Sequence, residues 1–128
     1  MANVFLSHRG ADKVPAERLA EALRDDGHTV WLDTWRIQVG DSIIGKMNEG
    51  LAGATFLILC LSSDTSEAPW MDREWMAALA SQLEGADMRV LPAKLTGGVL
   101  PAILRDVKYA DLVKDWQVGV DALCKALG

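Results

Sequence analysis

The run Ala54-Thr55-Phe56-Leu57-Ile58-Leu59-Cys60-Leu61 is the most continuous apolar stretch of the sequence. Its apolar residues do not alternate with polar ones, which is typical of a strand that is covered on both faces. Even counted from Ala52 to Leu61, the apolar run is about half as long as a helix that spans a bilayer. It therefore predicts a buried strand in the sheet of a soluble domain, and the rest of the chain can be placed around it.

Upstream of this strand, the apolar spacing switches between the period of a strand and that of a helix. Val4–Leu6 is a short apolar strand. Apolar side chains then recur at helical spacing over residues 16–23, and Gly27 follows as a helix-ending residue. His28–Leu32 is rich in strand-forming residues, and residues 42–51 carry a second helical pattern. We therefore expect a strand, a helix, a strand and a helix before the central strand.

Downstream, the same alternation continues to the end of the sequence. Residues 70–83 have helical spacing, Arg89–Pro92 is a short strand, and Val107–Tyr109 is a weak last strand. Trp116–Leu127 predicts a final amphipathic helix. This order indicates an α/β fold: one flavodoxin-like domain over residues 1–128, with a mostly parallel five-stranded sheet and helices on both faces.

Composition and charge exclude several classes of protein. The chain has 128 residues, half of them hydrophobic, which fits one globular domain. Its net charge of −5 argues against direct nucleic-acid binding, which depends on Lys and Arg. The N-terminus does not resemble a signal peptide, and Cys60 and Cys124 are expected to be free buried thiols in a reducing compartment. We therefore expect a cytoplasmic protein without a membrane segment.

Common catalytic motifs are missing from the chain. The turn after the first strand, Ser7–Asp12, has a single glycine and matches neither phosphate-binding loop. No serine stands on a G-x-S-x-G elbow, and adjacent Ser7 and His8 would point to opposite faces of a strand. His8 is expected to be a polar residue at a strand end, and His28 a surface residue at a strand start. With two histidines and no acidic cluster beside them, no metal site is expected.

Three segments should meet where the sheet binds its ligand. Open α/β sheets bind ligands beyond the carboxyl ends of the strands, at the point where the strand order reverses. This rule selects Ser7–Arg9, Asp33–Asp41 and Ser62–Glu74. In the last segment Trp70 and Glu74 are four residues apart, hence on one helical face. Glu74 is either a functional carboxylate or a solvated helix residue, and Trp70 either a ligand contact or a packing anchor.

The chain resembles a bacterial Toll/interleukin-1 receptor (TIR) domain. The stretch Val4-Phe5-Leu6-Ser7-His8-Arg9 is similar to the opening motif of that family. Leu32-Asp33-Thr34 and the following residues to Ser42 are similar to the end of its second strand and its BB loop. The stretch from Ser62 to Glu74 is similar to the segment after its third strand. The similarity covers nearly the whole chain.

The resemblance implies a site that cleaves NAD⁺. Enzymatic TIR domains use a glutamate four residues after a tryptophan, which here is Glu74 after Trp70. The expected substrate-binding residues are Ser7, Arg9, Trp35, Arg36, Gln38 and Trp70, with Lys13 as a weaker candidate. Arg9 would hold the diphosphate, and residues 34–41 would form a lid. NAD⁺ is then a substrate, and neither a cofactor nor a metal is expected.

The resemblance also implies how the activity is used. We expect an NAD⁺ glycohydrolase or ADP-ribosyl cyclase that is switched on by homotypic TIR self-association and serves antiphage defence. A sensor domain or a partner chain is a further candidate partner. The alternative is a non-catalytic TIR module that acts by homotypic binding. Only Trp116 stands where animal adaptors have an aromatic pair, which weakens that alternative. A more distant alternative is an enzyme like the nucleoside deoxyribosyltransferases, acting on a nucleoside.

Overall fold

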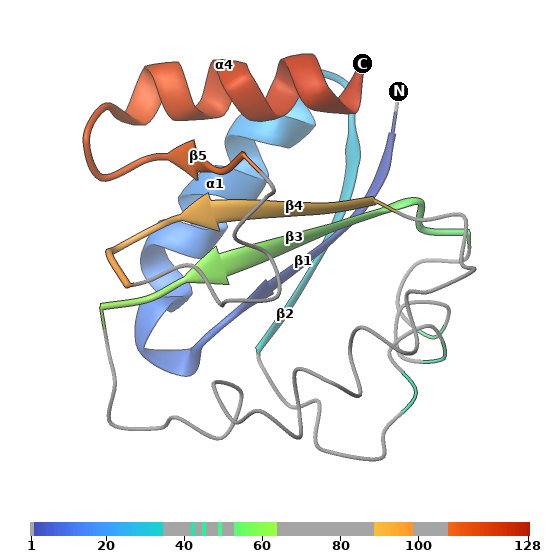
Figure 1. The fold of residues 1–128 in the computed structure, drawn as a ribbon. Coiled ribbons are helices and arrows are strands. Elements are labelled where there is room, and N and C mark those ends of the chain that lie inside the picture. The colour runs from blue at the N-terminus through green and yellow to red at the C-terminus, as the bar shows by residue number, and fades with distance from the viewer. Residues whose placement is uncertain are drawn as a thin grey trace.

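Five parallel strands form a single sheet in the order β2-β1-β3-β4-β5 (Figure 1). In the computed structural model these strands are Asn3–His8 (β1), Thr29–Thr34 (β2), Phe56–Leu61 (β3), Arg89–Lys94 (β4) and Ala110–Asp111 (β5). The order 2-1-3-4-5 is that of the flavodoxin-like doubly wound folds. The α/β class and the parallel sheet predicted from the sequence are therefore confirmed.

The structure describes residues 2–34, 42, 45, 49, 53–63, 89–98 and 108–128. The helical elements of this part are η1 (Gly10–Asp12), α1 (Lys13–Asp25) and α4 (Trp116–Leu127). The helices expected at 42–51 and 70–83 lie outside the described residues. Among the helices that are described, none has the length and apolar character needed to cross a bilayer.

Helix α1 forms where the apolar spacing predicts it and buries the predicted face. Its buried residues are Ala16, Leu19, Ala20 and Leu23. Gly27 follows the helix with φ +96°, a left-handed conformation that glycine adopts without a steric penalty. The chain then turns directly into β2. The sequence prediction for this helix and its end is confirmed.

Helix α4 matches the predicted range, Trp116–Leu127. Asp115 caps it, since its carboxylate accepts a hydrogen bond from the Val118 N–H at 3.1 Å. The helix buries Val120, Leu123 and Leu127. At its first turn the Arg18 guanidinium of α1 lies 4.0 Å from the centre of the Trp116 ring. The two helices thus contact each other on one face of the sheet (Figure 1).

Strand β3 is the centre of the sheet and is buried on both faces. Ile58 and Cys60 belong to the core that α1 and α4 cover. Leu57, Leu59 and Leu61 point to the opposite face and are each 1% exposed. The prediction that this strand is covered on both sides is confirmed.

The last strand is shorter and later than the sequence predicts. Strand β5 consists of Ala110–Asp111, which pair with Ala93 and Lys94 of β4. Of the predicted stretch 107–109, Lys108 and Tyr109 are described; both are exposed and outside the strand. The prediction of a strand at 107–109 was wrong. A strand of two residues is too short to show an alternation of apolar and polar side chains in the sequence. Strand β4 itself extends beyond the predicted Arg89–Pro92 to Lys94.

Candidate active site

Ser7 and Arg9 lie at the carboxyl edge of the sheet, where its strand order reverses. Strand β1 is flanked by β2 and β3, and Ser7 is in register with Asp33 of β2 and Leu59 of β3. The chain leaves β1 and β3 at this edge and continues to opposite sides of the sheet order. This is the position at which open parallel sheets bind ligands.

Both residues are buried, which matters most for Arg9. The exposed fractions are 1% for Ser7 and 4% for Arg9. A guanidinium is rarely buried unless polar or anionic groups surround it. Arg9 is therefore not a solvent-exposed surface arginine. Its contact with a diphosphate stays a prediction, as does any ribose contact of Ser7.

A hydrogen-bonded link joins three loops at this edge. The Thr96 hydroxyl donates to Oδ2 of Asp12 at 3.0 Å and accepts the N–H of Ser63 at 3.1 Å. Asp12 ends η1 after β1, Ser63 follows β3, and Thr96 follows β4. One side chain thus fixes the exits of three strands relative to one another. The segment that begins at Ser63 leads along the chain to Trp70 and Glu74.

Close backbone packing reinforces the same link. Gly98 has φ +90°, and a Cβ built on it would lie 2.6 Å from the carbonyl oxygen of Ser62. The loop after β4 therefore rests directly on the backbone that follows β3. Glycine is required here both by the positive φ and by the absence of space.

The remaining predicted site residues lie outside the described residues. They are Trp35, Arg36, Gln38, Trp70 and Glu74. Their roles stay predictions. Lys13, the weaker candidate, is exposed at the start of α1.

Sequence reasoning missed Asp12 and Thr96. The two residues are 84 positions apart, so no local pattern connects them. Asp12 follows the first strand within the turn that the sequence singles out, which was the available signal. Thr96 gives no sequence signal, since threonine is common in loops that follow a strand.

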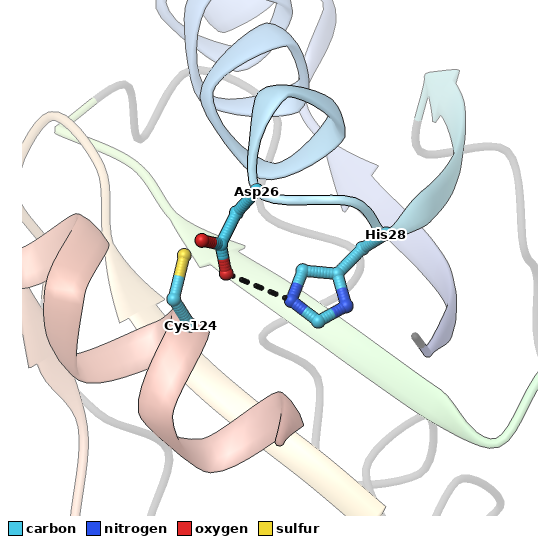
Figure 2. Close-up of side chains that lie close together, drawn as sticks. All are labelled: Asp26, His28 and Cys124. Carbon is cyan, nitrogen blue, oxygen red and sulfur yellow. Dashed lines mark hydrogen bonds and ion pairs between the residues drawn. The ribbon is translucent and has the colours of Figure 1, made fainter.

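A second polar cluster lies at the opposite, amino-terminal edge of the sheet (Figure 2). It consists of Asp26 after α1, His28 before β2 and Cys124 in α4. One ligand atom from each of the three side chains lies within 4.8 Å of the other two. His28 Nε2 is 3.1 Å from Oδ2 of Asp26. We call these three residues the amino-edge cluster.

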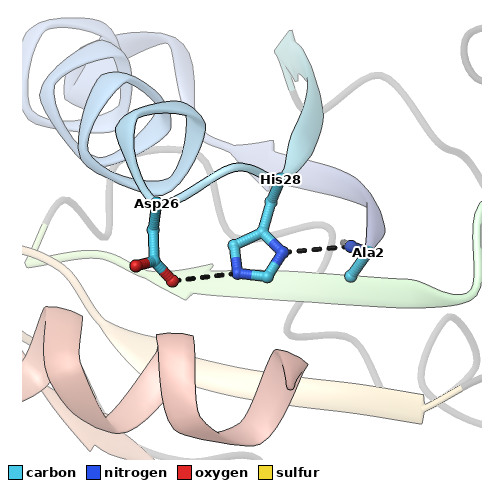
Figure 3. Close-up of polar contacts among 3 residues, drawn as sticks. All are labelled: Ala2, Asp26 and His28. Carbon is cyan, nitrogen blue, oxygen red and sulfur yellow. Dashed lines mark hydrogen bonds and ion pairs between the residues drawn. The ribbon is translucent and has the colours of Figure 1, made fainter.

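His28 is buried, and its prediction as a surface residue was wrong (Figure 3). It is 6% exposed, and its Nδ1 accepts the N–H of Ala2 at 3.0 Å. Since Nδ1 accepts, the ring proton of the neutral imidazole belongs on Nε2, which donates to Asp26. Both ring nitrogens are therefore partnered inside the protein. The partner Ala2 is 26 residues away, just before the neighbouring strand β1, so the local sequence did not show it.

The two cysteines are free, but their surroundings differ. Cys60 is fully buried, and desolvation raises the pKa of its thiol far above the ordinary range. Cys124 is half-buried. Desolvation and then a hydrogen bond to Asp26 raise the pKa of the Cys124 thiol to about 11. Both cysteines are free, as predicted, although Cys124 is less buried than expected.

Comparison with known proteins places this α/β domain in a family. Residues 4–124 match the TIR domain family, which is almost the entire chain. The chain therefore belongs to the TIR domain family. Its fold is similar to the crystal structure of the RPS4 and RRS1 TIR domain heterodimer, with a TM-score of 0.63 and 15% identity. That similarity covers 98% of this chain and 95% of the other.

Bacterial relatives are similar in sequence over part of their length. The 2′ cyclic ADP-D-ribose synthase BtTIR of Bacteroides thetaiotaomicron is 35% identical over 82 residues, which are 63% of this chain and 29% of the relative. The NAD(+) hydrolase PdTIR of Paracoccus denitrificans is 32% identical over 91 residues, 70% of this chain and 30% of the relative. The chain thus spans about a third of the length of these curated relatives.

Proposed function

We propose that this TIR domain cleaves the bond between nicotinamide and ribose in NAD⁺, with Glu74 as its catalytic residue. The observation that carries the proposal is the similarity to bacterial TIR proteins named as an NAD(+) hydrolase and a cyclic ADP-ribose synthase. The chain also has the glutamate four residues after a tryptophan. The buried Arg9 at the carboxyl edge supports an anion-binding site there.

One carboxylate is enough for this reaction. Glycosidases commonly use two carboxyl groups because the leaving oxygen must be protonated. Nicotinamide departs from a cationic pyridinium as a neutral base, so no general acid is required. The remaining task is to stabilise the positive charge that develops on the ribose. At about 5 Å and an effective dielectric constant near 20, an ionised Glu74 contributes about 3 kcal/mol, or roughly two decades of rate.

The further rate enhancement requires orientation and exclusion of water. In this proposal Arg9 holds the diphosphate and Ser7 the ribose, while Trp35, Arg36, Gln38 and Trp70 complete the substrate contacts. The link from Thr96 to Asp12 and Ser63 fixes the residue from which the chain continues toward Glu74. The nucleophile that then reaches the anomeric carbon decides the product: water gives ADP-ribose, and a hydroxyl of the same molecule gives a cyclic product.

Self-association is the proposed means of activation. A neighbouring copy would order the lid at residues 34–41 and exclude water from the site, so a dilute monomer should be weakly active. The similarity of the fold to a TIR domain heterodimer is consistent with this arrangement. We place the reaction in the cytoplasm, where NAD⁺ is available and free thiols such as Cys60 and Cys124 persist. Antiphage defence is the proposed context.

The proposal is tested by NAD⁺ consumption with product identification, over a wide range of protein concentration. Activity per chain should rise with concentration and fall by at least about 100-fold in Glu74→Gln. The matched control is Glu17→Gln, which changes an exposed glutamate of α1 and should retain activity. A folded, assembled wild type that leaves NAD⁺ intact would refute the enzyme and favour a non-catalytic interaction module. Cleavage of nucleosides alone would point to a deoxyribosyltransferase-like enzyme.

A further inference from the structure

The amino-edge cluster combines three kinds of metal ligand at one place. Asp26 offers a carboxylate, His28 an imidazole and Cys124 a thiol, all within 4.8 Å of one another (Figure 2). The three residues come from the end of α1, the approach to β2 and the last turn of α4. The cluster lies before β2 begins, whereas Ser7 and Arg9 lie where β1 ends. Because the strands are parallel, it is at the other end of the sheet from the candidate active site.

We propose that Asp26, His28 and Cys124 bind one zinc ion, with water as the fourth ligand. Zinc accepts sulfur, nitrogen and oxygen ligands together, and three protein ligands with water is a common arrangement. Magnesium and calcium prefer oxygen ligands alone, so this mixed set disfavours them. Bonds of about 2.0 to 2.3 Å place tetrahedral ligand atoms about 3.3 to 3.6 Å apart. The ligand atoms lie within 4.8 Å of one another, so no separation needs to shorten by more than about 1.5 Å.

The burial of the three side chains suits an ion that enters from solvent. The His28 side chain is 3% exposed and therefore closely surrounded by protein, so it is the fixed ligand. The Asp26 side chain is 53% exposed, and Cys124 is half-buried. These two can adjust their rotamers to close around an ion, and the exposed side of Asp26 leaves a path for it and for the bound water.

Binding requires a defined rearrangement of protons. The His28 ring proton now lies on Nε2, between the ring and Asp26. Zinc on Nε2 moves that proton to Nδ1, where it faces the Ala2 N–H and breaks that hydrogen bond (Figure 3). The Cys124 thiol loses its proton to solvent. Overall, one Zn²⁺ enters, one H⁺ leaves, and no electrons are transferred. His28 thus gives up both of its hydrogen bonds, to Ala2 and to Asp26. Two lost hydrogen bonds still cost little beside the affinity of protein zinc sites.

The first test is a zinc titration of the metal-free full chain against a chromogenic chelator. We expect one zinc per chain, and a Co²⁺-loaded sample should show thiolate-to-metal absorption. His28→Gln and Cys124→Ala should each weaken binding by more than tenfold. The matched controls are Cys60→Ala, which removes the other cysteine, and Asp25→Asn, which removes an exposed neighbouring carboxylate. Both should bind as the wild type does. Binding that survives His28→Gln and Cys124→Ala, or none at micromolar zinc, would overturn the site.

A second test uses the wild type alone and does not depend on the variants folding. Zinc should protect Cys124 from alkylation, and a chelator should reverse the protection. The ¹⁵N signals of His28 should change from a protonated Nε2 to a protonated Nδ1 when zinc is added. Unchanged alkylation of Cys124 together with an unchanged His28 tautomer would refute the proposal.

Discussion

Gly98 joins two loops at the candidate site through the absence of a side chain. Its φ is +90°, and a Cβ would meet the Ser62 carbonyl oxygen at 2.6 Å. Gly98→Ala therefore adds a steric overlap to the conformational cost, and we expect it to lower the free energy of unfolding by about 3 to 4 kcal/mol. Gly27→Ala is the matched control, since φ is +96° with nothing within 4 Å of the added Cβ. It should cost about 1 to 2 kcal/mol. Urea denaturation measures both, and equal losses would contradict the contact with Ser62.

The pH dependence of Cys124 alkylation measures the effect of its neighbour Asp26 on the thiol. Desolvation and then Asp26 raise the pKa of the Cys124 thiol to about 11, so alkylation in chelator should quicken about tenfold per pH unit up to that value. Asp26→Asn removes a negative charge that opposes the thiolate. It should lower this pKa and quicken the reaction at pH 8, whereas Asp25→Asn should change it little. Mass spectrometry distinguishes Cys124 from Cys60. An unchanged rate in Asp26→Asn would show that burial and the charge of Asp121, and not Asp26, set the pKa.

At the scale of elements, Thr96 connects η1, the exit of β3 and the exit of β4. Thr96→Val keeps the shape but leaves the Ser63 N–H and the buried Asp12 carboxylate each without this partner. We expect it to lower the free energy of unfolding by about 2 kcal/mol, while Thr96→Ser keeps the hydroxyl and most of the stability. NAD⁺ cleavage should fall in Thr96→Val more than in Thr96→Ser, because the segment after Ser63 leads to Glu74. Equal activity in the two variants would show that the hydrogen bonds of Thr96 do not affect catalysis.

The elements differ in how well the sequence predicts them, for physical reasons. Helices α1 and α4 repeat apolar residues over several turns, and both were predicted nearly to their ends. Strand β5 has two residues, too few for a period, and was misplaced. Ser7 and Arg9 could be assigned to the edge because the order of the elements fixes where β1 ends. The burial of His28 could not be predicted, because Ala2 and Asp26 surround it only once β1 and β2 pair.

For the whole molecule, net charge governs how readily copies approach one another. The chain carries −5 at neutral pH, so identical copies repel at long range. The Debye length falls from about 30 Å at 0.01 M salt to about 8 Å at 0.15 M. If assembly activates NAD⁺ cleavage, less protein should be needed for half-maximal activity per chain at 0.15 M salt than at 0.01 M. We expect that protein concentration to fall several-fold. Light scattering on the same samples should show assembly at the same threshold.

Salt also weakens the binding of an anion such as NAD⁺, for which Arg9 is the proposed contact, and the design must separate the two effects. At saturating NAD⁺ and at a protein concentration above the threshold, activity per chain should not depend on salt. Below the threshold it should rise with salt, since only assembly is then limiting. A threshold that rises with salt would contradict the prediction. It would mean that the contact between copies is held by opposite charges close enough to outweigh the repulsion of two acidic molecules.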